Sequence, residues 1–537
     1  MALLAELRAQ STSAKPPEPA IGPLPAQYNF AADILQRNLA AGRAGKAAFI
    51  DARGTWSYGA LAERAERFGA ILRDLGIQRE QRILICLLDS IDWPTAFLGA
   101  LKAGVVAVPV NTLLTEDDYQ FMLAHSRAKL LVVSEALYPK FANLIGSCPD
   151  LEHVIVSGDN AFGHRQFEDL LDRSSPLASS PDTSCDDIAF WLYTSGSTGK
   201  PKGAVHLHGN LKLTHDLYGG PVLGLQESDL CYSVAKLFFA YGLGNALTFP
   251  MSVGATTVLL AERPTPESVA ALLRRHPISV FYGVPTFYAA FLASDAAPES
   301  SELQLRRCVS AGEALPSDLG RRWLERYGVD ILDGLGSTEM LHIFLSNRPG
   351  EVRYGTTGKP VPGYDIKLLG DDGAPVKRGE MGELLVRGPT SAIMYWNNRA
   401  QSRTTFLGEW TRSGDKYVED EEGFFVYCGR GDDMLKVSGM YVSPFEVEAA
   451  LLSHPEVLEA AVVAWADGEG LIKPKAFIVL RAGVEARSGM AEALQEHVKS
   501  RLAPFKYPRW IEFRSELPKT ATGKIQRFKL RNEAAAR

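Results

Sequence analysis

Apolar runs of strand length alternate with amphipathic helical segments through the first two thirds of the chain. From Ser57 the apolar residues recur every three or four positions as far as Gly76, which is the spacing of an amphipathic helix. The run ILICLL at 83–88 follows, then a helical segment over 93–103 and the run VVAVPV at 105–110. A strand, a helix and a strand joined by short connections form a βαβ unit, which requires a parallel sheet.

The same pattern continues to about residue 360. Further strand-length runs lie at 130–134, 189–194, 255–260, 279–284 and 329–332. Helical segments separate most of them, so residues 26 to about 360 are predicted to form a layered α/β structure. Short strands with DDG and EEG turns then predict a small β-rich section. Past Arg430 a compact α+β pattern is expected, with a helix from Ser443, strands near 457–465 and 474–480, and a helix over 489–502.

The length of the chain indicates at least two domains, because 537 residues are too many for one ordinary core. We predict a loosely ordered arm over 1–25, an N-terminal domain over 26–431 and a C-terminal domain over 432–537. The expected fold class is α/β, with a large layered N-terminal domain that carries the small β-rich subdomain. The smaller C-terminal domain is expected to be α+β and mobile.

Composition excludes several classes of protein. The 57 basic and 63 acidic residues give a net charge of −6, which argues against nucleic acid as a partner. The six cysteines are scattered without a CxxC pair, as expected of reduced thiols. The N-terminus has too short an apolar run for a signal peptide, and no stretch reaches the length of a membrane-spanning helix. We therefore expect a cytoplasmic globular protein with no membrane partner.

The stretch YTSGSTGKPKG at 193–203 directly follows one of the apolar runs. The ends of buried strands are where open α/β sheets bind ligands, and consecutive N–H groups in a glycine-rich loop form an anion-binding nest. Hydroxyls and lysines add further donors, so the loop is predicted to bind a polyphosphate rather than to serve as a flexible linker. The candidate residues are Thr194, Ser195, Gly196, Ser197, Thr198, Gly199, Lys200 and Lys202. It is not the P-loop of NTPases, since Pro201 follows Lys200 where that motif has Ser or Thr and opens a helix.

A second candidate is the stretch DGLGSTEM at 333–340, expected to follow a strand. Thr338 could hold a phosphate and Glu339 a divalent cation. One carboxylate suffices for Mg²⁺, which usually takes one or two carboxylates together with phosphate oxygens.

Five stretches occur in a fixed order: YTSGSTGKPKG (193–203), GLGSTE (334–339), WTRSGDKY (410–417), GRGDDMLKVSG (429–439) and PKTATGK (518–524). In this the chain resembles the adenylate-forming superfamily of acyl-CoA synthetases, peptide-synthetase adenylation domains and beetle luciferases, over about residues 40 to 530. The resemblance implies ATP, Mg²⁺ and coenzyme A as cofactor and co-substrates. It also implies two half-reactions: a carboxylate attacks the α-phosphate of ATP with loss of pyrophosphate, and a thiol then displaces AMP.

The resemblance also implies the roles of individual residues. The glycine-rich loop would hold the β- and γ-phosphates, Thr338 the α-phosphate and Glu339 the metal, while Lys524 would be the catalytic lysine. Asp432 would be the hinge about which the C-terminal domain rotates between the half-reactions. Adenine and ribose contacts map onto Ala311, Gly312, Glu313, Asp333, Gly334, Leu335, Gly336, Asp415 and Arg430. The CoA channel maps onto Lys436, Ser438 and Gly439.

The segment KLFFAYGLGN at 236–245 occupies the position that lines the acyl pocket in this family, and with GSTEMLHIF it resembles aryl-CoA ligases. The expected pocket walls are Phe238, Ala240, Tyr241, Tyr282, Gly336, His342 and Ile343. The bulk of Tyr241, His342 and Ile343 favours a short, flat acid over a long acyl chain, although Phe238 could instead belong to the core. Benzoate is the favoured substrate, with 4-hydroxybenzoate and 2-aminobenzoate as close alternatives.

Other functions remain open at this stage. The thiol acceptor could be a carrier protein, although no carrier domain is fused here, and a luciferase shares the same motifs. A non-catalytic nucleotide sensor is disfavoured because Lys524, Glu339 and Asp415 are all present. A zinc site at His206 and His208 lacks an obvious third ligand. The expected partners are thus a small aromatic acid, ATP and CoA, with the protein a monomer or homodimer.

Overall fold

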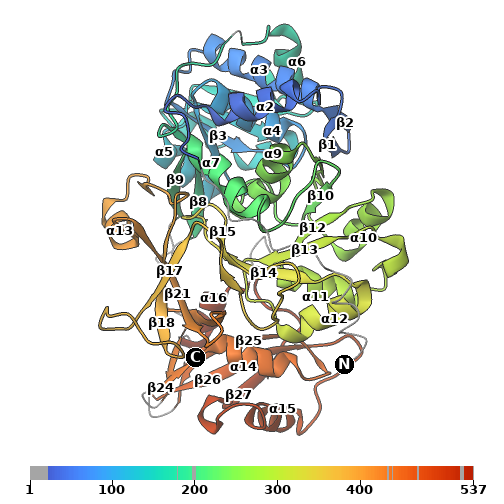
Figure 1. Ribbon diagram of the computed structural model, residues 1–537, viewed down its shortest axis with the longest axis vertical. Coiled ribbons are helices and arrows are strands. Elements are labelled where there is room, and N and C mark those ends of the chain that lie inside the picture. Colours follow the sequence, from blue (N-terminus) through green and yellow to red (C-terminus); the bar gives the residue numbers. More distant parts are fainter. Residues whose placement is uncertain are drawn as a thin grey trace.

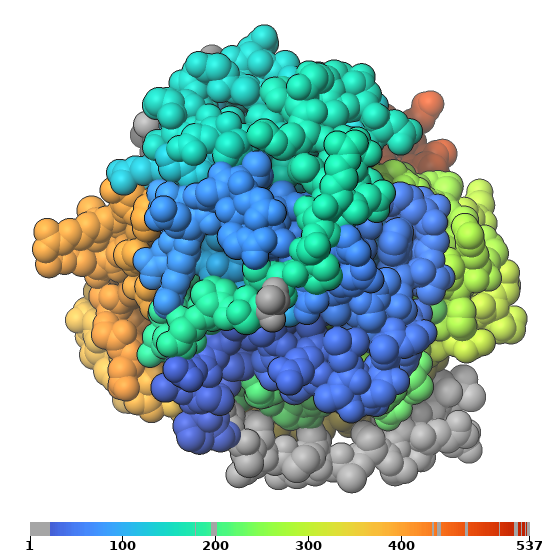
Figure 2. Space-filling model, turned by 90° about the horizontal axis from the view of Figure 1, so that it is seen from above, coloured from blue at the N-terminus to red at the C-terminus, as the bar shows by residue number. Residues whose placement is uncertain are grey.

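The computed structural model describes residues 22–177, 179–195, 201–431, 434–437, 440–467, 471–519 and 525–535. Figure 1 shows the first half of the chain at the top, the β-rich section at the lower left and the C-terminal elements across the bottom. In the space-filling view from above, blue and teal residues from the first third of the chain cover this end of the molecule (Figure 2).

The first sheet contains the predicted βαβ unit. Its strands in spatial order are β19 (Met394–Tyr395), β9 (Pro201–Leu207), β8 (Ile188–Ser195), β4 (Val106–Pro109), β3 (Arg82–Cys86), β5 (Leu130–Ser134), β6 (His153–Ser157) and β7 (Arg165–Gln166). Strands β3 and β4 are parallel and are joined by α4 (Asp92–Lys102), as the sequence predicts. Helix α3 (Tyr58–Asp74) begins where expected, since the Ser57 side chain accepts from Ala60 N at 3.1 Å.

The second sheet contains the parallel strands that carry the predicted adenine-binding segments, whereas the strands that the glycine-rich stretch connects belong to the first sheet. In spatial order its strands are β16 (Lys359–Pro360), β15 (Ile343–Ser346), β14 (Ile331–Gly336), β13 (Arg307–Ala311), β12 (Val280–Gly283), β10 (Leu230–Ser233), β11 (Thr256–Val258), β1 (Ala47–Asp51) and β2 (Gly54–Ser57). From β14 to β1 every neighbouring pair is parallel. Together the two sheets and their helices confirm the α/β class.

Most of the helices pack against these two sheets (Figure 1). The α-helices not yet given are α2 (Phe30–Ala40), α5 (Glu116–Ser126), α6 (Phe167–Arg173), α7 (His208–Thr214), α8 (Ala240–Leu243), α9 (Phe249–Val253), α10 (Pro266–Arg275), α11 (Pro285–Ala293), α12 (Ser317–Tyr327) and α13 (Arg399–Thr405). Shorter 3₁₀ or π turns are η1 (Glu135–Lys140), η2 (Ile145–Ser147), η3 (His215–Gly219), η4 (Gly244–Thr248) and η5 (Ser300–Glu302). The π turn η4 begins within the predicted acid-pocket segment 236–245 and extends past it, and π turns are frequent at functional sites.

The remaining elements form the β-rich section and the C-terminal region. The β-rich section consists of β17 (Asp365–Leu369), β18 (Met381–Arg387), β20 (Phe406–Leu407), β21 (Trp410–Glu419) and β22 (Phe425–Arg430). After it come β23 (Leu435–Val437), β24 (Met440–Val442), α14 (Pro444–Leu452), β25 (Val457–Ala466), β26 (Ile472–Leu480), α15 (Met490–Lys499), η6 (Pro504–Lys506), β27 (Trp510–Phe513) and α16 (Arg527–Ala535). Strands β25, β26 and β27 form one sheet, in agreement with the predicted α+β pattern.

One expectation about local structure was wrong. Strand β14 does not end at Leu332 but continues to Gly336, so Asp333–Gly336 are strand residues rather than a loop after the strand. The segment from Pro201 to Leu207 is also a strand, β9, which pairs antiparallel with β8. The glycine-rich stretch therefore connects two paired strands and does not lead into a helix. Glycines obscured the strand pattern in β14, since glycine is rare in strands.

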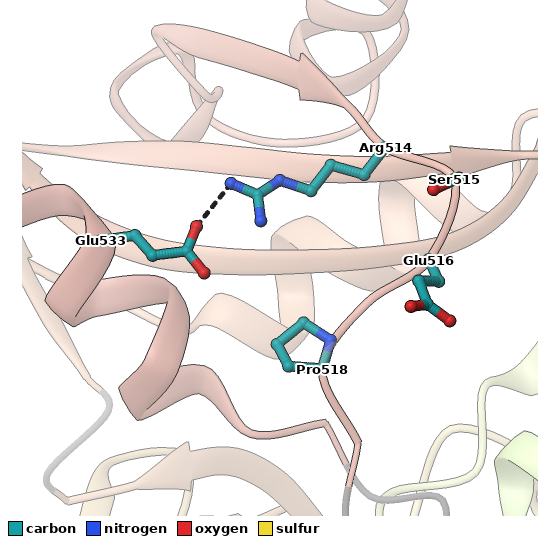
Figure 3. Close-up of a pocket in the computed structure, with 5 residues that line it drawn as sticks. All are labelled: Arg514, Ser515, Glu516, Pro518 and Glu533. Atoms are coloured by element: carbon teal, nitrogen blue, oxygen red, sulfur yellow. Dashed lines mark hydrogen bonds and ion pairs between the residues drawn. The ribbon is translucent and has the colours of Figure 1, made fainter.

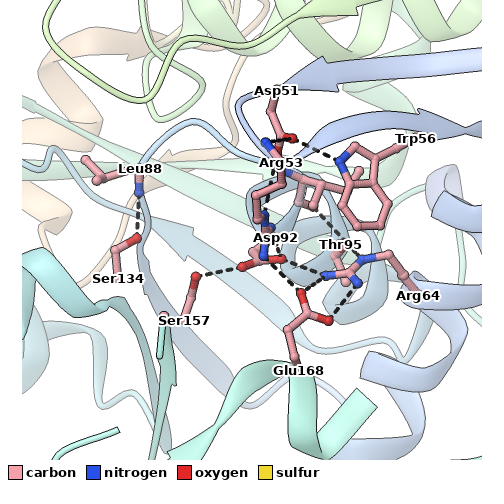
Figure 4. Close-up of polar contacts among 12 residues, drawn as sticks. Asp51, Arg53, Trp56, Arg64, Leu88, Asp92, Thr95, Ser134, Ser157 and Glu168 are labelled. Carbon is pink, nitrogen blue, oxygen red and sulfur yellow. Dashed lines mark hydrogen bonds and ion pairs between the residues drawn. The ribbon is translucent and has the colours of Figure 1, made fainter. Parts of the chain in front are cut away.

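A buried ionic cluster links the helices above the first sheet (Figure 4). Asp92 is 1% exposed and accepts from Arg53 Nη2, Arg64 Nη2 and Ser157 Oγ, each at 2.6 Å. Glu168 bonds the same two guanidinium groups. Because the partners come from β2, α3, α4, β6 and α6 or residues beside them, the cluster fixes these elements relative to one another.

We predict that Asp92→Ala lowers the free energy of unfolding by about 3 kcal/mol, because Arg53 and Arg64 lose their buried partner and keep only the partly exposed Glu168 in common. Urea unfolding followed by far-UV circular dichroism measures this change. Asp74→Ala is the matched control, since the Asp74–Arg73 pair is more than half exposed on both sides, and such a pair contributes about 0–1 kcal/mol. Equal losses in the two variants would contradict a stabilising role for the cluster.

Candidate nucleotide and acid site

The carboxyl ends of β12, β13 and β14 bring the predicted nucleotide segments side by side. Ser310 is paired with Asp333 and Ala311 with Gly334 across β13 and β14. At Gly312 the chain leaves β13 with φ of +92°, and a Cβ there would meet nothing within 4 Å. This is the edge where open α/β sheets bind ligands, and the gap beside the Gly312 backbone leaves room for a flat base.

Burial controls the charge of Asp333 in this edge. The side chain is 5% exposed, and desolvation raises its pKa well above its usual range. Burial therefore disfavours the charged form of this carboxyl group.

The backbone of the GSTE motif is held by a neutral histidine. His206 Nε2 lies 2.7 Å from the carbonyl oxygen of Thr338, and Asn210 Nδ2 lies 3.0 Å from His206 Nδ1. Burial lowers the pKa of His206 to about 4. The neutral ring therefore donates from Nε2 to Thr338 and accepts at Nδ1 from Asn210. This explains His206 as a support for the motif, whereas His208 lies at the start of α7.

The turn after the motif is strained. Leu341 has φ of +66°, and its N–H donates to the Thr338 carbonyl at 3.2 Å. Such a conformation costs a non-glycine residue about 1–3 kcal/mol, and it persists only where the surroundings enforce it. The strain places the turn among features that cluster at functional sites.

Glu339 has a partner that the sequence did not suggest. The Tyr395 hydroxyl donates to Glu339 Oε1 at 2.5 Å, and Ala392 N donates to the Glu339 carbonyl at 2.7 Å. Lys202 Nζ lies 5.2 Å from the centre of the Tyr395 ring. Because β19 pairs with β9, Tyr395 and the Glu339 carboxylate that it bonds lie beside the strand that follows the glycine-rich stretch. A tyrosine in the run MYWN gives no local signal of this role.

The two predicted ribose contacts lie on adjacent strands of the β-rich section. Asp415 on β21 and Arg430 on β22 are paired antiparallel, with Arg430 Nη1 3.4 Å from Asp415 Oδ1. The Asp415 N–H donates to Ser413 Oγ at 3.0 Å. Asp415 is therefore a strand residue in a fixed position rather than part of a simple glycine turn.

The polar part of the predicted acid pocket is centred on Tyr241 and His342. The Tyr241 hydroxyl lies 3.2 Å from the carbonyl oxygens of Gly283 and Val309. His342 Nε2 lies 3.2 Å from Asn245 Oδ1 and 3.3 Å from the Tyr241 carbonyl. Burial lowers the pKa of His342 to about 3, so the ring is neutral, and these two acceptors place its proton on Nε2.

The other residues predicted to line the acid pocket include Phe238, Ala240, Gly336 and Ile343. Phe238 is 6% exposed and contacts Phe239, with ring centres 4.5 Å apart, and Ala240 begins α8. Gly336 is paired with Ile343, and a Cβ at Gly336 would lie 2.7 Å from the His342 carbonyl oxygen. A side chain at that position would therefore displace the turn that carries His342.

Several predicted residues lie outside the described part of the chain. They are Gly196, Ser197, Thr198, Gly199, Lys200, Asp432, Ser438, Gly439 and Lys524. Of their neighbours, Thr194 and Ser195 end β8 opposite Lys202 and Pro201, and Lys436 lies in β23. The functions predicted for these residues remain predictions.

An open recess of about 390 Å³ lies elsewhere, in the C-terminal region (Figure 3). It is lined by Arg514, Ser515, Glu516, Pro518 and Glu533, and Arg514 pairs with Glu533 at 2.7 Å. No aromatic side chain lines it, and we assign it no role in the chemistry. Among the residues that the structure describes, no cluster of three His, Cys, Asp or Glu side chains could hold a metal, and no helix is long and apolar enough to span a membrane.

Comparison with known proteins places this site in a family. The AMP-binding enzyme model matches residues 36–396, and the model of the AMP-binding enzyme C-terminal domain matches 446–524. A benzoate–CoA ligase of Thauera aromatica is 58% identical over 95% of this chain and 97% of its own. A crystal structure of a benzoate CoA ligase from Burkholderia xenovorans LB400 has a TM-score of 0.89 and 54% identity, covering 94% of this chain and 100% of that one.

A second solved structure is the anthranilate CoA ligase AuaEII with anthranoyl-AMP, with a TM-score of 0.92 and 43% identity over 96% of this chain and 98% of that one. These likenesses extend over nearly the whole chain, as the five ordered motifs do. The chain therefore belongs to the AMP-binding enzyme family, which confirms the adenylate-forming family predicted from its motifs.

Proposed function

We propose that this protein is an ATP-dependent benzoate–CoA ligase. A benzoate oxygen attacks the α-phosphorus of ATP, the bond to the β-phosphate breaks, and benzoyl-AMP and pyrophosphate form. The thiol of CoA then attacks the acyl carbon, the bond to AMP breaks, and benzoyl-CoA, AMP and a proton result. The observation that carries the proposal is the 58% identity to a benzoate–CoA ligase along almost the entire chain.

The geometry supports a nucleotide across the ends of β13 and β14. The adenine would lie beside Gly312 and Asp333, the ribose at Asp415 and the α-phosphate near Thr338. Phosphoryl chemistry of this kind depends on positioning and on stabilising the charge that develops on phosphate oxygens. The bond from His206 to the Thr338 carbonyl and the contacts of Asp415 with Ser413 and Arg430 support such positioning.

The donor set fits Mg²⁺ bound together with the nucleotide. Glu339 offers one hard carboxylate oxygen, held in place by Tyr395, and phosphate oxygens would complete the coordination. When bound, the metal would neutralise part of the charge on the phosphates.

The acid pocket supports a small uncharged ring. Because His342 is neutral and Tyr241 is engaged with backbone carbonyls, no positive charge from these two residues would stabilise a second carboxylate on the ring. The bulk of Tyr241 and of the buried Ile343 supports a short, flat acid over a long acyl chain.

A substrate panel tests the proposed function. Purified protein with ATP, Mg²⁺ and CoA is given benzoate, 4-hydroxybenzoate, 2-aminobenzoate, a short alkanoate or a long fatty acid, and acyl-CoA, AMP and pyrophosphate are quantified. We expect the highest kcat/KM with benzoate and equal amounts of AMP and pyrophosphate. A higher kcat/KM with a fatty acid would refute the pocket assignment, and release of ADP would refute the reaction.

We predict that Tyr395→Phe raises the Mg²⁺ concentration for half-maximal activity about tenfold, because a metal ligand loses the group that orients it. Mn²⁺ binding in the presence of ATP, measured by electron paramagnetic resonance, should weaken in parallel. Tyr354→Phe is the matched control: it removes a tyrosine–carboxylate bond of the same kind, 2.8 Å to Asp330, that does not involve the GSTE motif. An unchanged metal dependence in Tyr395→Phe would contradict the orienting role.

We further propose a cytoplasmic location. All six cysteines are unpaired, and Cys86, Cys231 and Cys308 are buried thiols whose pKa values burial raises. Unpaired, unreactive thiols are typical of a reducing compartment.

A further inference from the structure

The C-terminal region contacts the segment that follows β13, through the residue after the predicted catalytic lysine in the sequence. The backbone N–H of Ile525 donates to Glu313 Oε1 at 3.3 Å, across 212 positions of the sequence. Ile525 immediately follows Lys524. A side chain of the large domain is thus bonded to the segment that carries the lysine.

The segment is anchored on its other side as well. Lys519 and Ile525 form an antiparallel bridge, and Gln526 N donates to the Pro518 carbonyl at 2.8 Å. Lys519 Nζ bonds Glu459 Oε1 on β25 at 2.5 Å. Lys519 and Ile525 are therefore paired with each other, Lys519 is fixed to the C-terminal sheet through Glu459, and Glu313 bonds Ile525.

Glu313 is well placed to act as an acceptor for Ile525. The positive φ of Gly312 turns the chain out of β13 just before it, and Glu313 is half-buried. A hydrogen bond from an N–H to a carboxylate is about twice as strong as one between neutral groups. A rotation of the C-terminal region would break this hydrogen bond, because its donor and its acceptor belong to different regions of the chain.

We propose that Glu313 is a positioning residue that, through Ile525, holds the C-terminal region at the ends of β13 and β14 for adenylation and releases it before the thiol reacts. This rests on the proposed function and differs from the nucleotide contact that the motif resemblance implies for Glu313. The bond from Ile525 to Glu313 would stabilise the position of the C-terminal region in which benzoyl-AMP forms.

The test separates the two half-reactions. Glu313→Ala and Glu313→Gln are compared in two assays: benzoate-dependent pyrophosphate–ATP exchange, and benzoyl-CoA formation from supplied benzoyl-AMP. We expect Glu313→Ala to slow exchange about tenfold or more, the effect of losing a hydrogen bond to a charged group, with thioester formation changed less than about twofold. Glu313→Gln keeps a carbonyl acceptor and should recover most of the exchange rate.

ATP affinity decides between positioning and nucleotide contact. Calorimetric titration of each variant with ATP should give a dissociation constant close to that of the unsubstituted protein. Glu302→Ala, which removes an exposed pair with Arg274, should change neither half-reaction. A loss of ATP affinity that accounts for the slower exchange, or equal losses in both half-reactions, would overturn the proposal.

Failure of the proposed function would look different. If the unsubstituted protein activates another acid, the same comparison is made with that acid, and the ratio of the two half-reactions still tests Glu313. If Glu313→Ala leaves that ratio unchanged while the protein forms benzoyl-CoA, the positioning role alone is refuted.

Discussion

Lys524→Ala is expected to reduce benzoyl-AMP formation by about 10²–10³-fold while leaving thioester formation from supplied benzoyl-AMP close to normal. A lysine ammonium bridges the carboxylate and the α-phosphate only while charge moves between them, and loss of one such preorganised donor costs about this factor. The second half-reaction transfers an acyl group already activated, so it does not need that cation.

Single-turnover quenched-flow measurements with benzoate and ATP give the first rate, and thioester absorbance from synthetic benzoyl-AMP and CoA gives the second. Lys529→Ala is a suitable control, because Lys529 is an exposed lysine of α16 close by in the chain. Parallel loss of both half-reactions in Lys524→Ala would refute the assignment of the lysine to adenylation.

Asp432→Pro is expected to give the opposite result: adenylation largely intact and thioester formation slowed on the order of tenfold or more, a barrier increase of about 1.4 kcal/mol per factor of ten. Proline fixes φ near −65° and so blocks rotation at the residue predicted to be the hinge. The bond between Ile525 and Glu313 joins the C-terminal region to the chain just after β13, and the predicted rotation at Asp432 would break it.

The same two assays measure this effect, and Asp432→Ala separates the ring from the lost carboxylate. If rotation is what matters, Asp432→Ala should transfer the acyl group far faster than Asp432→Pro. Pyrophosphate exchange that falls as much as thioester formation would show that proline damages the fold instead of locking the hinge.

Most of the large-scale architecture could be predicted from the sequence, because hydrophobic periodicity and helix caps are local signals. Ser57 and Gly76 mark the limits of α3, and the apolar runs mark β3, β4 and β5. The same signals failed where function imposes its own residues on a strand. Gly334 and Gly336 have low strand propensity, yet β14 includes them, because its pairing with β13 and β15 outweighs that propensity.

The site was predictable only as far as motifs carry it. The structure brings the predicted adenine segments together on β13 and β14, and it pairs Asp415 with Arg430 on β21 and β22, while the roles of these residues remain predictions. The supports were not found, because His206, Asn245 and Tyr395 act through contacts with residues far away in the sequence. The link between Tyr395 and Glu339 spans 56 positions and depends on the pairing of β19 with β9.

The pairing of Asp415 with Arg430 has a consequence for the order of product release. Strand β22 ends at Arg430, two residues before the predicted pivot, and points near an axis of rotation move least. A sugar bound there would keep its contacts while distant groups exchange places. AMP should accordingly stay bound after the thiol has displaced it, so we expect benzoyl-CoA to be released before AMP.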